Sequence, residues 1–407
     1  LEVNFRNVRL PDALVGILTI LAAFGAGRAA GGRRAGLLAA LFVAIQPLHV
    51  QMSRECYFYA PIVLGCFLAL WAVLHLADRL ERRQPQGPVF YLLAFAGFLL
   101  LSNVQISSWN FAALFAVTLY VLLVPPALRG QRSWRPVVVL TLGFFLIGCP
   151  SLLSEWGMRD AIKSLFGERK DYWQNIFGER LGNPWIDSGR IFFAYLTGSG
   201  GFRIWTSLLC VLAGIGAIAG RWKSDRKIRV FGGFAATTIL LLVTLHMKSP
   251  YPMENRHYAN LFPLLVIGSC LGFLYWADRL GVLLARGREA RPAAAAAAGL
   301  LLLGVNAYPA WMSTKLDWEP PHAAISRWVD RNLPPRSVVL CDRWFNPWNE
   351  YRVNPSTNVV YTFTVPNEPV QVYTSSRWRV TAMEFINRNP LAAYLELKSY
   401  WTRLSPW

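Results

Sequence analysis

The apolar run "YFYAPIVLGCFLALWAVLHL" occupies residues 57–76 and decides the class of fold. A helix needs about 20 such residues to cross roughly 30 Å of hydrocarbon, and this run has that length. The charged stretch "DRLERR" follows at 78–83. An apolar run of this length that ends in arginines is typical of a transmembrane helix, so the sequence predicts a membrane protein.

The composition of the whole chain supports this prediction. Of its 407 residues, 54% are hydrophobic and only 16% are charged, which argues against an ordinary soluble domain. Apolar stretches near the length of a membrane span recur along the chain. The ten candidate spans are 10–27, 35–50, 57–76, 89–106, 110–124, 136–153, 204–220, 230–247, 259–277 and 293–312.

The basic residues gather in alternate connections between these spans. The five connections are 28–34, 78–88, 125–136, 221–229 and 278–292. Together they hold 18 Lys and Arg against five Asp and Glu, or 13 of the formal net charge of +18. Such loops face the cytoplasm under the positive-inside rule. The basic excess therefore indicates topology, and no nucleic-acid partner is expected.

This topology places the remaining connections and the end of the chain outside the cytoplasm. Residues 1–313 are predicted to form one multi-span domain with an outer loop at 154–203, and residues 314–407 to form a small extracytoplasmic domain. In the latter we expect a helix at Ala323–Asn332 and strands at Ser337–Cys341 and Asn358–Phe363. The predicted fold class is an all-α polytopic membrane protein with an α/β or irregular C-terminal domain.

Ionisable groups interrupt the apolar pattern in "QPLHVQMSRECYFYAP", residues 46–61, on the predicted outer face. One interpretation is an Arg54–Glu55 pair at the membrane surface with tyrosines in the aromatic belt. The other is that Arg54 binds an anionic head group, since a guanidinium suits phosphate, while Glu55 and Tyr59 orient it or contact a sugar hydroxyl. His49 lies in the same stretch.

A second cluster on the predicted outer face has a similar make-up. Glu254, Arg256, His257 and Tyr258 precede the span that contains Pro263. As for the first cluster, these residues either anchor the span at the membrane interface or bind a ligand. The six cysteines are scattered without CxxC spacing, so neither a metal site nor a disulfide framework is indicated.

Three blocks in order resemble those of a known family. They are "RLPDALVG" at 9–16, "GRRAGLLAA" at 32–40 and "PLHVQMSRE" at 47–55 with Tyr59. They are similar to bacterial membrane glycosyltransferases of the GT-C class, in particular glycosyltransferase family 39, the protein mannosyltransferase-like group. Residues 256–263 are similar to a later block of that group.

The resemblance implies transfer of a sugar from a polyprenyl-phosphate donor to a protein, lipid or glycan acceptor, with inversion, at the outer face of the bacterial cytoplasmic membrane. It implies a donor-phosphate or substrate site with Arg54 as its main cation. The other residues assigned to that site are Glu55, Tyr59, Arg9, His49, Arg256, His257 and Tyr258. No cofactor is assigned, the lipid-linked sugar donor is a substrate, and a divalent metal is left open but is not indicated.

The catalytic residue is the main departure from the family pattern. The resemblance implies a catalytic Asp in an outer loop upstream of Leu1, so we expect a chain truncated at its N-terminus and assign no catalytic residue. Two other functions remain open, a flippase or transporter of lipid-linked glycan and a non-catalytic relative that binds it. A transporter predicts polar residues at mid-span depth, where this chain has almost none.

Overall fold

The computed structural model describes most of the predicted membrane domain and four strands. The described residues are 5–53, 59–104, 108–153, 201–248, 259–284, 297, 338–342, 358–363, 371–374 and 379–381. The chain divides into two compact units, Leu1–Phe166 with Gly182–Lys315 and Gly167–Leu181 with Leu316–Trp407. The first unit contains the described helices, and the second contains the strands.

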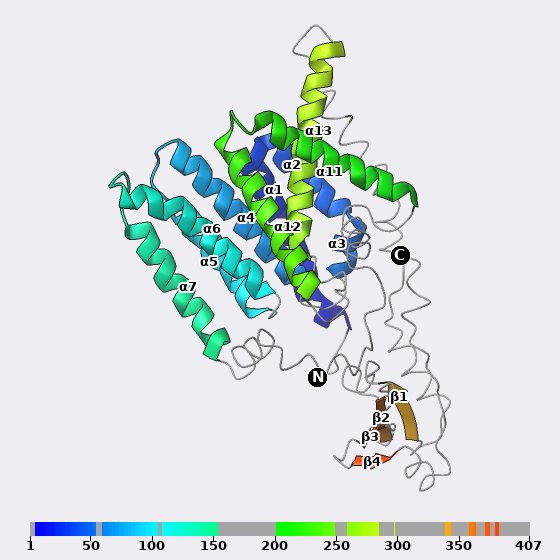
Figure 1. The fold of residues 1–407 in the computed structure, drawn as a ribbon. Coiled ribbons are helices and arrows are strands. Elements are labelled where there is room, and N and C mark those ends of the chain that lie inside the picture. The colour runs from blue at the N-terminus through cyan, green and yellow to red at the C-terminus, as the bar shows by residue number, and fades with distance from the viewer. Residues whose placement is uncertain are drawn as a thin grey trace. The chain divides into compact units, whose positions relative to one another are not determined.

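Helices make up the described part of the first unit (Figure 1). They are α1 (Phe5–Gly31), α2 (Arg33–Ile45), α3 (Pro47–Met52), α4 (Tyr59–Glu81), α5 (Pro88–Asn103), α6 (Trp109–Leu128), α7 (Arg135–Leu153), α11 (Gly201–Arg221), α12 (Arg226–Lys248) and α13 (Phe262–Leu284).

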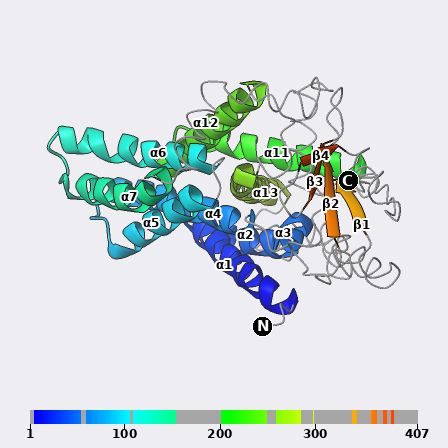
Figure 2. The ribbon, with the colours of Figure 1, turned by 90° about the horizontal axis from the view of Figure 1, so that it is seen from below.

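Helix α4, which contains the opening apolar run, is the centre of this bundle. It packs against α1, α5, α6, α12 and α13, and Figure 2 shows α13 end-on beside it. Phe67, Leu70 and Leu74 are fully buried. A helix that is apolar on every side is stable only when neighbours surround it, which explains its position. In contrast, α7 exposes Leu142, Leu146 and other large apolar side chains, as a helix that faces lipid does.

Five described helical segments are long and apolar enough to cross a membrane. They are Leu10–Gly31, Tyr59–Glu81, Trp109–Leu128, Arg226–Thr244 and Ala259–Arg279. Each coincides with a predicted span, so the prediction of a polytopic helical membrane protein is confirmed. The candidate span at 293–312 lies outside the described residues apart from position 297.

The predicted span 35–50 is not one continuous helix. Helix α2 ends at Ile45, Gln46 is extended with φ −80° and ψ 120°, and α3 begins at Pro47. The residue before a proline is driven out of the helical region by contact with the proline ring, which accounts for the break. The Gln46 side chain then starts α3, because its Oε1 accepts a hydrogen bond of 2.8 Å from the His49 backbone N–H.

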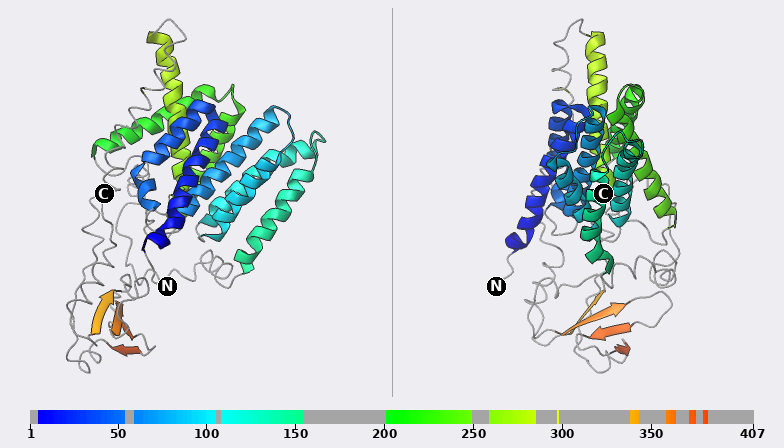
Figure 3. Two further views of the ribbon diagram at one scale, coloured as in Figure 1. Left: turned by 180° about the vertical axis from the view of Figure 1, so that it is seen from behind. Right: turned by 90° about the vertical axis from the view of Figure 1, so that its left-hand side faces the viewer.

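Helices α1 and α4 run side by side in the same direction (Figure 3). The backbone of α1 lies against Ser53 at Gly16 and against the Trp71 ring at Gly25. The ends of α1 and α4 that precede basic loops are therefore at the same end of the bundle. We call this the basic end, and the opposite end, where α3 lies, the α3 end.

The second unit contains a four-stranded sheet in the order β1-β2-β3-β4. Its strands are β1 (Val338–Asp342), β2 (Asn358–Phe363), β3 (Gln371–Thr374) and β4 (Arg379–Thr381). Strands β1 and β2 are parallel, while the other two pairs are antiparallel. Both predicted strands are thus present, whereas the predicted helix at Ala323–Asn332 lies outside the described residues.

Candidate functional site

The short helix α3 is held between α1 and α13 by the side chain of His49. This side chain is only 4% exposed. Its Nε2 lies 3.3 Å from the carbonyl oxygen of Gly16 in α1, and its ring is stacked on Phe262 at the start of α13, with centroids 6.3 Å apart. The Ser53 hydroxyl donates a 2.8 Å hydrogen bond to the His49 carbonyl and closes the turn after α3. His49 therefore joins three helices.

Glycine at position 16 permits this arrangement. A Cβ at Gly16 would come within 2.4 Å of Ser53 Oγ and 2.8 Å of Ser53 Cβ, far inside van der Waals contact. The missing side chain lets α3 approach the backbone of α1 closely enough for the His49 hydrogen bond. Gly16 belongs to the "RLPDALVG" block, but the sequence alone assigned no role to it.

His49 is a neutral side chain in this environment. Burial lowers its pKa from the usual 6.5 to about 4, although the hydrogen bond to the Gly16 backbone acts in the opposite direction. The Gly16 carbonyl can only accept, so Nε2 carries the proton and Nδ1 has a free lone pair. Within the described residues Nδ1 has no hydrogen-bond partner. His49 is thus suited to holding helices in place and not to binding phosphate as a cation at neutral pH.

Two further contacts join α4 to the start of α13. The Cys66 thiol donates a 3.2 Å hydrogen bond to Asn260 Oδ1, and both side chains are buried. The Phe67 ring meets Phe262 edge to face at 6.1 Å. Tyr59, the first residue of α4, is also buried, with 8% of its surface exposed. The start of α4 and the start of α13 are therefore fixed to each other.

The predicted site residues divide according to what the structure describes. His49 and Tyr59 are described with their side chains. For Arg9 the structure describes only the backbone, in α1, about two helical turns before Gly16. The others, Arg54, Glu55, Arg256, His257 and Tyr258, lie outside the described residues.

The described residues nevertheless connect the two sequence clusters. Segment 54–58 lies in the chain between Ser53 and Tyr59, and segment 251–258 ends next to Ala259. His49 precedes the first segment in the chain, and its ring contacts that of Phe262, which follows the second segment. The sequence had no signal for this pairing, because residues 59–250 separate the two segments. In the described part of the chain, no group of three or more His, Cys, Asp or Glu side chains could hold a metal ion.

Comparisons with known proteins agree with this architecture. Residues 1–153 match the family model of the dolichyl-phosphate-mannose-protein mannosyltransferases. The predicted resemblance to this family is confirmed over those residues. The mannosyltransferase-like region comprises α1 to α7, so it contains His49 and Tyr59, while Asn260 and Phe262 lie beyond it. No match was found among curated protein sequences.

Solved structures extend the likeness over most of the chain. The crystal structure of ArnT from Cupriavidus metallidurans bound to undecaprenyl phosphate is similar with a TM-score of 0.53 and 14% identity, covering 86% of this chain and 71% of that chain. ArnT in the apo state is similar with the same TM-score and coverage and 13% identity. At this identity the likeness concerns the fold alone, and the predicted all-α polytopic membrane fold is confirmed.

Proposed function

We propose that the protein is a membrane glycosyltransferase that moves a sugar from a polyprenyl-phosphate donor to an acceptor at the outer face of the bacterial cytoplasmic membrane. The observation that carries the proposal is the contact between His49 and Phe262, which joins the chain segments next to both Arg-containing clusters. The mannosyltransferase-like match of residues 1–153 and the ArnT fold support the same reaction class.

In this proposal Arg54 and Arg256 act on the donor phosphate. The acceptor hydroxyl oxygen attacks the anomeric carbon, the bond from that carbon to the phosphate oxygen breaks, and the configuration inverts. Negative charge then develops on the departing polyprenyl phosphate, where a guanidinium with two parallel N–H donors stabilises it. The acceptor proton passes to a carboxylate base, to which we assign no residue of this chain.

The helices at the α3 end give this site a rigid base. Arg54 follows Ser53, whose hydroxyl is bonded to the His49 carbonyl, and Tyr59 is buried at the start of α4. Arg256 precedes Ala259 and Asn260, which are buried. A binding group gains catalytic effect when it is held in one position, so anchored flanking residues favour a site in which both arginines meet one phosphate.

A transfer assay tests the proposal. The whole protein would be reconstituted in vesicles with polyprenyl-phosphate sugars of several types and with candidate acceptors, and sugar transfer would be measured. Arg54→Ala and Arg256→Ala should each lower the rate by at least tenfold, while Arg33→Ala at the basic end should leave it unchanged. Full activity of both site variants would contradict the assignment, and no transfer from any donor would contradict the reaction class.

A further inference from the structure

The basic end of the bundle contains a second cluster of arginines with an organised backbone. Arg132 Nη1 donates a 2.8 Å hydrogen bond to the carbonyl oxygen of Gln84, and this bond joins the α6–α7 turn to the α4–α5 turn. The two turns also carry exposed side chains. We call the arginine rim the set Arg82, Arg83, Arg129, Arg132, Trp134 and Arg135.

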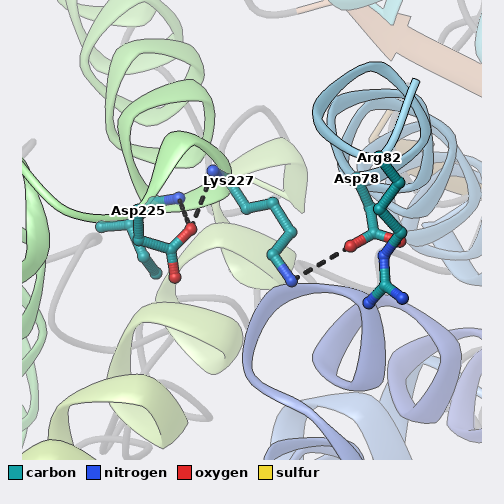
Figure 4. Close-up of polar contacts among 5 residues, drawn as sticks. Asp78, Arg82, Asp225 and Lys227 are labelled. Atoms are coloured by element: carbon teal, nitrogen blue, oxygen red, sulfur yellow. Dashed lines mark hydrogen bonds and ion pairs between the residues drawn. The ribbon is translucent and has the colours of Figure 1, made fainter.

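Two acidic side chains lie near the rim: Glu81 is exposed and directly precedes Arg82, whereas Asp78 is already engaged in ion pairs. Asp78 Oδ2 lies 3.0 Å from Arg82 Nε, and Asp78 Oδ1 lies 3.3 Å from Lys227 Nζ at the start of α12 (Figure 4). Asp225 lies in the turn before α12 and accepts from the Lys227 backbone N–H at 2.9 Å. Within the described residues, the exposed rim cations Arg83, Arg129 and Arg135 form no ion pair with an acidic side chain, so their charges face outward.

The backbone at Arg83 has a positive φ angle, which is unusual for a residue with a side chain. Helix α4 ends with hydrogen bonds from the Gln84 N–H to the Arg79 carbonyl and from the Arg83 N–H to the Leu80 carbonyl. Helix α6 ends with an equivalent pair of backbone hydrogen bonds. This motif needs a left-handed residue, which in α6 is Gly130 with φ 65° and in α4 is Arg83 with φ 55°. A non-glycine residue is strained in this conformation.

The rim also contains an aromatic side chain suited to a membrane surface. Trp134 is 44% exposed and directly precedes Arg135, the first residue of α7. An exposed indole beside the end of a membrane-crossing helix is typical of the head-group level, and guanidinium groups bind phosphate through paired N–H donors. Clustered cations beside spans are attracted to anionic lipid.

From these observations we propose that the arginine rim is a binding site for the head-group phosphate of an anionic phospholipid, with Trp134 at the boundary to the acyl chains. Arg132 holds the two turns together, while Arg83, Arg129 and Arg135 contact the phosphate. The arginine rim lies entirely at the basic end, so lipid binding there is independent of the proposed glycosyl transfer. The chemistry needs a phosphodiester carried by lipid, because the indole and the ends of the spans fix the depth of the site.

Fluorescence quenching tests the site directly. The full chain would be placed in phosphatidylcholine nanodiscs that contain either brominated phosphatidylglycerol or brominated phosphatidylcholine. Subtracting the fluorescence of the Trp134→Phe variant from that of the unchanged chain gives the fluorescence of Trp134 alone. We expect severalfold stronger quenching of Trp134 by the brominated anionic lipid, and we expect the triple variant Arg83→Gln/Arg129→Gln/Arg135→Gln to lose this preference.

A matched control separates the rim from general surface charge. Arg33→Gln/Arg34→Gln/Lys223→Gln removes the same charge from exposed positions at the same end and should keep the preference of Trp134 for phosphatidylglycerol. If the triple variant does not fold, Arg83→Gly tests the same site. Glycine suits the φ of 55° at this position, so this variant should fold at least as well as the unchanged chain, and its Trp134 should show a weaker preference for phosphatidylglycerol. Equal quenching by both lipids, or equal loss in rim and control variants, would overturn the proposal.

Discussion

The His49 ring is stacked on the Phe262 ring, with centroids 6.3 Å apart and planes inclined by 12°. This contact joins α3, which ends just before the first Arg-containing cluster, to α13, which begins just after the second. A neutral histidine can join these helices because its ring packs like a phenyl ring while its Nε2 donates a hydrogen bond to the Gly16 carbonyl. The first three predictions follow from this arrangement.

Removing the His49 ring should destabilise the bundle. In His49→Ala the Gly16 carbonyl loses its donor and Phe262 loses its stacking partner, so the free energy of unfolding should fall by about 2–3 kcal/mol. His49→Phe keeps the ring and should lose only about half as much. Denaturant unfolding in detergent measures both. A His49→Ala protein as stable as the unchanged chain would show that α3 does not depend on this side chain.

A side chain at position 16 should push α3 away from α1. Gly16→Ala places its Cβ against the Ser53 side chain and should cost about 1–3 kcal/mol. The double variant Gly16→Ala/Ser53→Gly removes the clashing atoms and should recover part of this loss. Gly233→Ala is the matched control, because a Cβ there meets no atom within 4 Å, and it should be neutral or stabilising.

Burial of neutral His49 should make stability depend on pH. The folded-state pKa is about 4 and the usual value is 6.5, so the unfolded chain takes up a proton first as the pH falls. The stabilising contribution is complete above about pH 6.5, decreases down to about pH 4 and amounts to about 3 kcal/mol. Unfolding curves of the unchanged chain and of His49→Gln, recorded across this range, should diverge by that amount. Parallel pH profiles would contradict a buried neutral histidine.

The ion pair between Asp78 and Lys227 should add modestly to stability. Both side chains are about one quarter exposed and their charged atoms are 3.3 Å apart, so a coupling of about 1 kcal/mol is expected. A double-mutant cycle with Asp78→Asn and Lys227→Met measures it, and raising the salt concentration should weaken it. If the two effects are simply additive, the pair does not hold α4 and α12 together.

The five long spans could be predicted because apolar length is a local property of the sequence. The strand Asn358–Phe363 was predicted with its observed bounds for a similar reason, since β-branched and aromatic residues cluster there. The break at Gln46 was not predicted, because the apolar pattern continues across it and only Pro47 marks the new helix. In that case local backbone sterics outweighed hydrophobic length.

The site was predictable only in part. Ionisable residues at the ends of spans identified both clusters, but the contacts that join them, His49 with Phe262 and Cys66 with Asn260, connect distant parts of the chain. His49 was predicted as a residue of the donor site, and nothing in its sequence context distinguishes an exposed ligand from a buried anchor. That distinction depends on Gly16 in another helix, and it required the packed structure.

We propose above that the α3 end binds a polyprenyl phosphate through Arg54. Titration of the full chain with undecaprenyl phosphate in detergent, followed by quenching of intrinsic tryptophan fluorescence, measures this without any need for the catalytic base. We predict saturable binding that weakens by at least tenfold in Arg54→Ala and is unchanged in Arg33→Ala. Equal affinity of the unchanged chain and Arg54→Ala, or no saturable binding by the unchanged chain, would contradict the account.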